Sequence, residues 1–206
     1  MLASLCLTMT PWWIRNYRVT GTAVLTTLQV GASLYDGLNP QATGASDMSF
    51  TRKIYWDLKA QPVAEQELFE VRLDRHYREV GWKWVWQEPG RVASLAGVKF
   101  LRMWNIWPNS AEIGSVWTYR LMTLAYLTLL ILSLVGAWKF ARLAHPAILC
   151  LLPAVYLTGL HVIFVSSIRY RQPAMLVLIV LAAAVATGLM DRQLRGSKLA
   201  RKWVKR

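Results

Sequence analysis

Hydrophobic positions gather into three long uncharged stretches in the second half of the chain. These stretches cover residues 121–138, 143–168 and 172–190, and a charged residue flanks each end. Crossing ~30 Å of hydrocarbon takes about 20 apolar residues, because a helix rises ~1.5 Å per residue. The pattern therefore predicts three transmembrane helices, at 119–139, 145–166 and 172–190.

The segment between residues 13 and 118 has a mixed pattern. An apolar residue recurs every three or four positions along one face, at Phe69, Leu73, Tyr77, Val80 and Trp84. This spacing predicts an amphipathic helix near 63–81, with Gly81 making its end uncertain, and a similar pattern predicts a second helix near 90–105. Residues 19–33 favour a loop or a short strand. Asp36-Gly37 and Asn39-Pro40 are typical of turns.

The opening residues form a short apolar run that Pro11 is predicted to end. Ten helical residues reach about 15 Å, half of the hydrocarbon thickness. We therefore interpret residues 1–12 as the outer end of a membrane helix whose beginning is missing. This interpretation predicts that the chain is the C-terminal portion of a longer protein or that its start is wrongly placed.

Composition strengthens the membrane interpretation. Apolar residues make up 55% of the 206 residues and charged residues 17%, with a mean hydropathy of +0.29. Soluble domains have about 25% charged residues. The apolar content excludes a disordered basic tail, and two cysteines in apolar runs exclude a disulfide framework. The expected class is an all-α membrane protein with three complete spans and a partial N-terminal one.

The charge distribution predicts the orientation. The tail at 191–206 carries seven cations and one acid, which places it in the cytoplasm by the positive-inside rule. Residues 13–118 then face the periplasm or exterior of a cell inner membrane. The net charge of +13 suits anionic membrane lipids, especially at the tail. A nucleic-acid partner is not expected, because the sequence has no basic stripe on a soluble face.

Candidate chemistry is sparse. The chain has no nucleophile elbow, phosphate-binding P-loop or metalloprotease motif. Its three His and two Cys lack zinc spacing, so we expect no metal and no cofactor. Asp36 and Asp47 have the carboxylate that a general base needs. Their local sequence, however, favours a role in forming turns.

The most distinctive motif is Arg169-Tyr-Arg-Gln-Pro173, at the outward end of the last predicted helix. Free N–H groups of a first helical turn and two guanidinium groups together make an anion site, which suits a phosphate at membrane depth. Alternatively, both arginines only extend to the interface and bind ordinary headgroups. His161 lies about two turns earlier, where an ionisable residue within a span is a functional candidate or simply satisfies a neighbouring backbone group.

Eight tryptophans lie between residues 13 and 118. An interfacial aromatic belt explains Trp13, Trp104, Trp107 and Trp117. A groove for a sugar or a lipid substrate is the other interpretation. Trp82, Trp84 and Trp86 alternate by two, which does not suit a single helical face.

An ordered set of motifs resembles the C-terminal half of bacterial GT-C membrane glycosyltransferases, the group similar to protein O-mannosyltransferases, aminoarabinose transferases and lipopolysaccharide-core sugar transferases. The stretch Thr10-Pro-Trp-Trp-Ile-Arg-Asn-Tyr17 resembles the family's Pro-Trp-x-x-Arg-Asn-Tyr, and Ser33-Leu-Tyr-Asp-Gly-Leu-Asn-Pro40 resembles its Leu-Tyr-x-Gly-Asn-Asn-Pro turn, except at Leu38. The later matching stretches are Asp74-Arg-His-Tyr-Arg-Glu79, residues 99–104, and His161 with 169–173.

The resemblance implies transfer of a sugar from a polyprenyl-phosphate carrier to an acceptor at the outer membrane face. It implies that Arg169 and Arg171 hold the carrier phosphate, that Tyr170 orients them or packs against the isoprenoid, and that Arg15 joins them. The candidate substrate-groove residues are His161, Trp104 and Lys99.

The family's catalytic carboxylate lies in an earlier outer loop that no residue here matches. The chain is therefore expected to need a missing N-terminal half and to be inactive alone, with no catalytic residue of its own. The main alternative is a non-catalytic membrane module that binds a lipid phosphate or scaffolds a partner. A transporter is disfavoured, because no interrupted apolar helix recurs in two halves.

Overall fold

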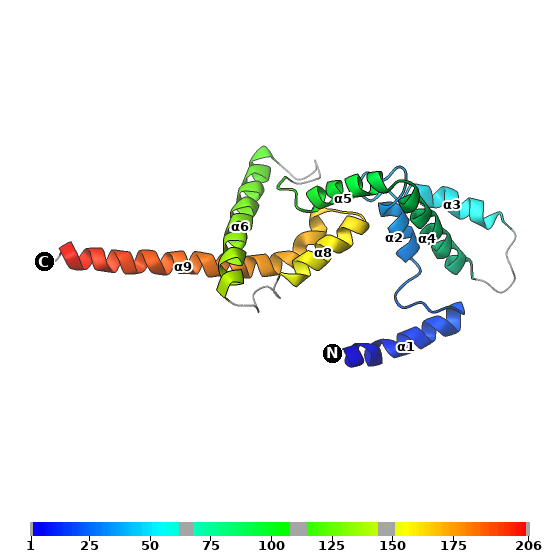
Figure 1. Ribbon diagram of the computed structural model, residues 1–206, viewed down its shortest axis with the longest axis horizontal. Coiled ribbons are helices and arrows are strands. Elements are labelled where there is room, and N and C mark those ends of the chain that lie inside the picture. The colour runs from blue at the N-terminus through cyan, green and yellow to red at the C-terminus, as the bar shows by residue number, and fades with distance from the viewer. Residues whose placement is uncertain (1, 62–67, 108–114, 144–150, 205–206) are drawn as a thin grey trace. The chain divides into compact units, whose positions relative to one another are not determined.

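A computed structural model describes residues 2–61, 68–107, 115–143 and 151–204, with the side chains of 140–143 and 190–204 left undescribed. All regular elements in these ranges are helical, which confirms the all-α class (Figure 1). The chain divides into two compact units, described separately below. Unit 1 comprises Met1–Lys99 and Val162–Val165, and unit 2 comprises Phe100–His161 and Ser166–Arg206.

Helix α1 (Leu2–Thr20) opens unit 1 and continues through Pro11. The prediction that Pro11 ends this helix is wrong. Proline removes one backbone donor inside the helix, but contacts beyond it hold the next two turns in place. The Trp13 indole donates to Leu25 O at 2.9 Å, and the Asn16 amide donates to Val24 O at 2.9 Å. The helix therefore crosses the predicted boundary at residues 12 and 13.

Two short helices in unit 1 were not predicted. Helix α2 (Val30–Gly37) replaces the end of the expected loop or strand and includes the expected Asp36-Gly37 turn, and α3 (Phe50–Lys59) follows it. Neither has a long apolar period. Helix α2 packs against α4 (Phe69–Gln87), where Gly31 N donates to the Asp74 carboxylate at 2.6 Å. These helices therefore depend on tertiary contacts.

Helix α4 confirms the amphipathic prediction but is shifted along the chain. It begins at Phe69, residues 63–67 lie outside the described residues, and it continues through Gly81 to Gln87. Trp84 is buried, whereas Trp82 and Trp86 are exposed. Positions 82 and 86 are one helical turn apart and share a face, so the alternation of tryptophans is compatible with a helix. Burial of Trp84 in the core carries the helix past Gly81.

The core of unit 1 lies between α2, α4 and α5 (Pro89–Met103). It contains Leu34, Leu38, Trp84 and Leu95, with Phe164 packed against it. Helix α5 matches the predicted helix at 90–105 to within two residues at each end. The ring centroids of Tyr35, Phe50 and Tyr77 lie 4.9–5.9 Å apart and join α3 to this core.

Unit 2 is built on the contact between α6 (Val116–Leu143) and α9 (Gln172–Val204). The two helices cross (Figure 1) where Gly136 faces the backbone of Leu181, and a Cβ at Gly136 would lie 2.6 Å from Leu181 O. The buried Ser133 hydroxyl lies 2.7 Å from Leu178 O. Small residues at such a crossing let two helix backbones approach closely.

The predicted middle span is shorter than expected. Helix α8 covers Leu152–Ile163, and residues 145–150 lie outside the described residues. Twelve residues span ~18 Å, less than a bilayer core. The helix ends at Ile163, before the predicted 166, because Ile163 O accepts a hydrogen bond from the Lys99 ammonium and Phe164 packs in the unit 1 core. These contacts replace the next helical bonds.

Two helical segments in the described part of the chain are long and apolar enough to cross a membrane, Val116–Lys139 and Ile168–Leu189. Three were predicted. Only 11% and 28% of their most apolar windows are buried, so neither resembles the core helix of a soluble protein. Helix α9 continues to Val204, which shows that the segment at 191–204 is a helical extension and not a separate irregular tail.

Candidate functional site

The arginine motif lies where η1 (Ile168–Arg171), a short 3-10 helix, leads into α9. Ser167 caps this turn, its hydroxyl accepting from Arg169 N at 3.5 Å. Pro173 follows in the first turn of α9, where a missing N–H costs no helical bond. The local sequence thus places Arg169, Tyr170 and Arg171 on consecutive positions of a tight turn.

The two arginines have different surroundings. The Arg171 guanidinium donates to Met103 O at 3.2 Å and to Asn105 O at 2.6 Å, and it lies 3.8 Å from the Tyr126 ring centroid. Arg171 therefore connects the start of α9 to the end of α5, to the segment that follows α5, and to α6. Arg169 is exposed. Of the predicted pair, Arg169 is therefore the more exposed residue.

An aromatic surface adjoins the motif. The rings of Tyr170 and His161 stack at 4.2 Å between centroids and 5° between planes. On the same helix as His161, the Thr158 hydroxyl accepts from the Trp104 indole at 3.2 Å. Unit 2 therefore contains five of the predicted site residues: Trp104, His161, Arg169, Tyr170 and Arg171. The stack holds the ring of Tyr170, the residue that follows Arg169 in the sequence.

Lys99 has other partners. It lies in unit 1 with 1% of its surface exposed, and its ammonium donates to Gly37 O at 2.8 Å and to Ile163 O at 2.6 Å. Burial lowers its pKa from 10.5 to about 8, while the nearby Asp36 carboxylate acts in the opposite direction. A substrate-groove residue would direct its ammonium to a ligand, whereas the Lys99 ammonium binds protein carbonyls. The role of Lys99 is therefore structural.

Arg15 also lies in unit 1. It is exposed on α1, with its guanidinium 5.1 Å from the Trp12 ring centroid. The structure therefore assigns Arg15 and Lys99 to one unit and the remaining predicted site residues to the other. The predicted cluster of Arg15 with Arg169 and Arg171 stays a prediction.

Two carboxylates considered for base chemistry stabilise a loop. The buried Asp36 carboxylate accepts from the Ser46 hydroxyl at 2.7 Å and from Asp47 N at 2.8 Å. The Asp47 carboxylate accepts from Ser49 N at 3.0 Å, and this bond lowers its pKa. Both therefore have the turn-forming role that their local sequence favours. In the part of the chain that the structure describes, no group of three metal-ligating side chains gathers.

Sequence reasoning missed two contributors to these sites. Tyr126 lies against Arg171, although a tyrosine within an apolar run is a detectable sign of a polar contact at that depth. Asp74 binds both Gly31 N and the Arg78 guanidinium, the second at 2.5 Å and four residues away. That spacing was visible in the sequence, whereas the bond to Gly31 was not.

Comparison with known proteins gives no relative. No family model, no curated protein and no solved structure matches the chain.

Proposed function

We propose that this chain is part of a membrane glycosyltransferase of the GT-C type and that it contributes the binding site for the carrier phosphate. The observation that carries the proposal is the contrast at η1. Arg171 is held by protein carbonyls, whereas Arg169 is exposed and directly precedes Tyr170, whose ring stacks on His161. An exposed guanidinium at a helix start suits a phosphate, which accepts paired N–H bonds.

The membrane location has its own support. The apolar surfaces of α6 and α9 are mostly exposed, and exposed apolar surface of this extent is stable in lipid and unfavourable in water. The contacts between the helices advance in the same sense along both, from Tyr126 with Arg171 to Gly136 with Leu181. This order agrees with a topology in which both run from the outer to the inner side of a cell membrane.

Sugar transfer enters through the sequence resemblance. In that reaction class, the phosphate leaves the anomeric carbon as a carboxylate elsewhere activates the acceptor. A cation at the phosphate stabilises the developing negative charge. Asp36 and Asp47 are engaged in loop contacts, so the chain is proposed to supply the cation and not the base.

The direct test measures binding of a polyprenyl phosphate to the purified full chain in lipid nanodiscs. Arg169→Gln should weaken binding about tenfold or more, since a hydrogen bond to a charged group contributes ~1.5–3 kcal/mol. Arg120→Gln is the matched control, because Arg120 is also an exposed arginine of unit 2. Unchanged binding in Arg169→Gln would reduce the motif to an interface anchor.

A second experiment addresses catalysis. Membranes that contain only this chain should transfer no sugar from a polyprenyl-phosphate donor, since the chain is proposed to supply no base. Turnover that disappears in Asp36→Asn or Asp47→Asn would contradict this. Phosphate binding without transfer, even with candidate upstream segments co-expressed, would favour the alternative of a non-catalytic module that binds a lipid phosphate.

A further inference from the structure

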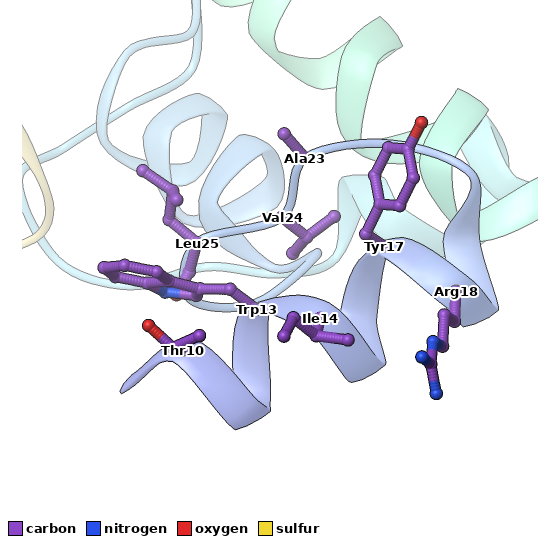
Figure 2. A pocket seen from close by; sticks show the side chains of 8 residues that line it. All are labelled: Thr10, Trp13, Ile14, Tyr17, Arg18, Ala23, Val24 and Leu25. Carbon is purple, nitrogen blue, oxygen red and sulfur yellow. The ribbon is translucent and has the colours of Figure 1, made fainter. Parts of the chain in front are cut away.

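An open apolar groove lies along the second half of α1, away from the arginine motif in sequence. It has a volume of about 360 Å³, and Figure 2 shows the side chains that line it. One wall is the α1 face with Trp13, Ile14 and Tyr17, and the other is the extended segment with Val24 and Leu25. Its volume lies in the range of small-molecule sites, ~300–1,000 Å³.

Hydrogen bonds join the two walls of the groove. The Trp13 indole donates to Leu25 O and the Asn16 amide to Val24 O, each at 2.9 Å. The Thr20 hydroxyl closes the turn between them, within 3.0 Å of Thr22 O. These bonds use the carbonyl groups of Leu25, Val24 and Thr22, and the surface that lines the groove is mostly apolar. The site is therefore formed before any ligand binds.

The charge around the groove has one sign. Residues 2–35 contain no Asp or Glu, and their cations are Arg15 and Arg18. Arg18 lines the groove, and in Figure 2 its guanidinium extends away from the apolar side chains. Arg15 is exposed on the same helix, against Trp12. An apolar slot with cations at its rim is complementary to an amphiphile with an anionic head.

Helix α1 also has exposed apolar residues outside the groove. Leu2, Leu5 and Leu7 of α1 are all about half exposed or more. Tryptophan and tyrosine favour the headgroup level of a bilayer. Trp12 and Trp13 follow the exposed leucines and precede Arg15, and Tyr17 directly precedes Arg18. The sequence of apolar, aromatic and cationic positions matches the depth profile of one lipid leaflet.

We propose that this groove binds an acyl chain of an anionic phospholipid, with the lipid phosphate held by Arg18 and Arg15. A peptide occupant is disfavoured because the mostly apolar lining of the groove offers few polar groups to a peptide backbone. The inference rests on the membrane location that the proposed function also requires, but not on carrier binding at Arg169. It assigns α1 a lipid-binding role of its own.

The test is photo-crosslinking of the full chain in nanodiscs with a phosphatidylglycerol whose acyl chain carries a diazirine, followed by peptide mapping. Label is expected within residues 10–25. Unlabelled phosphatidylglycerol should compete, whereas phosphatidylcholine and soluble glycerol phosphate should compete poorly. Each of Arg15→Gln and Arg18→Gln should lower this labelling about fivefold, as ~1 kcal/mol per surface cation implies.

Arg52→Gln is the matched control, an exposed arginine of the same unit whose loss should leave the label unchanged. Ala23→Phe should block the groove and displace the label without removing a charge. Absence of label from residues 10–25 would overturn the groove. Equal competition by phosphatidylcholine, or full labelling of the double arginine variant, would overturn the anionic headgroup.

Arg169→Gln separates this inference from the proposed function. It should weaken polyprenyl-phosphate binding about tenfold or more and leave the labelling of residues 10–25 unchanged. Loss of both in Arg169→Gln would contradict two independent sites. Label in the groove of a chain that binds no polyprenyl phosphate would reject the proposed function alone.

Discussion

Unit 1 and unit 2 are stabilised by different kinds of contact. Unit 1 buries charged side chains in its core, where Asp36, Asp74 and Lys99 bind backbone groups far away in sequence. Unit 2 joins its two long helices through small residues, with Ser133 and Gly136 at the crossing. A core with buried charges responds to pH and to loss of one hydrogen bond. A crossing of small residues responds to added volume.

The difference extends to the surfaces. The long helices of unit 2 direct most of their apolar side chains outward, as in a protein solvated by lipid. Unit 1 directs apolar residues into a core around Leu34 and Trp84 and leaves its α1 groove open. Substitutions in one unit should therefore leave the other unit's contacts unchanged, which the following experiments examine.

The largest effect is expected for Gly31→Ala in unit 1. A Cβ at Gly31 would lie 2.1 Å from Asp74 O and 2.8 Å from an Asp74 carboxylate oxygen. Helices α2 and α4 would have to separate and lose the Gly31–Asp74 bond, a cost of about 3 kcal/mol or more. Hydrogen exchange measured by mass spectrometry should accelerate in peptides of α2 and α4.

Gly90→Ala is the control for this substitution, because a Cβ there meets no atom within 4 Å. Exchange in α6 and α9 should be unaffected by either variant. Equal acceleration in both units after Gly31→Ala would show that the two units unfold together, which would contradict their independence.

A pH effect of about 2 kcal/mol is expected from Lys99. Its folded pKa of about 8 lies below its ordinary value of 10.5, so the unfolded chain binds more protons between these values. Stability should therefore rise with pH through this window, by about 2 kcal/mol between pH ~7 and ~9.5. The neutral amine keeps two N–H groups for its two carbonyl partners.

Urea unfolding of the full chain in mild detergent at the two pH values checks this, with Lys99→Met as the comparison. The variant should be less stable overall, since Gly37 O and Ile163 O lose their donor, and its stability should not rise with pH. Burial raises the pKa of Tyr35 and Tyr77, which therefore lower stability only above pH ~10. An equal rise in the variant would assign the effect to another group.

Gly136→Ala should destabilise unit 2 by about 2 kcal/mol. The added methyl group would lie 2.6 Å from Leu181 O, against backbone that cannot rotate away. Thermal unfolding by circular dichroism in detergent should show a lowered Tm. Gly188→Ala, on α9 with nothing within 4 Å, should be neutral or slightly stabilising, because alanine favours a helix by up to ~1 kcal/mol.

The smallest effect is expected for Ser133→Ala. Its hydroxyl lies 2.7 Å from Leu178 O on the partner helix and 2.6 Å from Leu129 O on its own. Interhelical hydrogen bonds in membranes average ~0.6 kcal/mol, so the shift in Tm should be just measurable. Thr128→Ala removes a hydroxyl bond that stays within α6 and should shift Tm less. The reverse order would show that Ser133 contributes no contact between helices.

The long helices were predictable because each has many apolar positions in phase. Helices α5 and α6 and the start of α9 lie within a few residues of their expected positions, whereas α4 begins and ends later than expected. The short α2 and α3 were not predictable, since their stability comes from partners such as Asp74, which binds Gly31 from 43 residues away. The local sequence pattern does not indicate such a contact.

At the candidate site, the sequence placed the arginine motif at the start of the last helix but treated its two arginines as equivalent. They differ because carbonyls of Met103 and Asn105, more than 60 residues earlier, satisfy Arg171. Lys99 was grouped with the substrate groove because its neighbours in sequence match a family motif. Its burial against Gly37 and Ile163 has no local signature.

The order of amino acids by itself determined the all-helical class, the two apolar helices of membrane length and the cationic turn at 169–171, because these depend on residues adjacent along the chain. Tertiary structure alone decided where α8 ends, which arginine is exposed and how α1 continues past Pro11. At the end of α8, a donor distant in sequence competes with the local helical bonds. At Arg171 and in α1, distant partners instead add contacts that the local pattern does not encode.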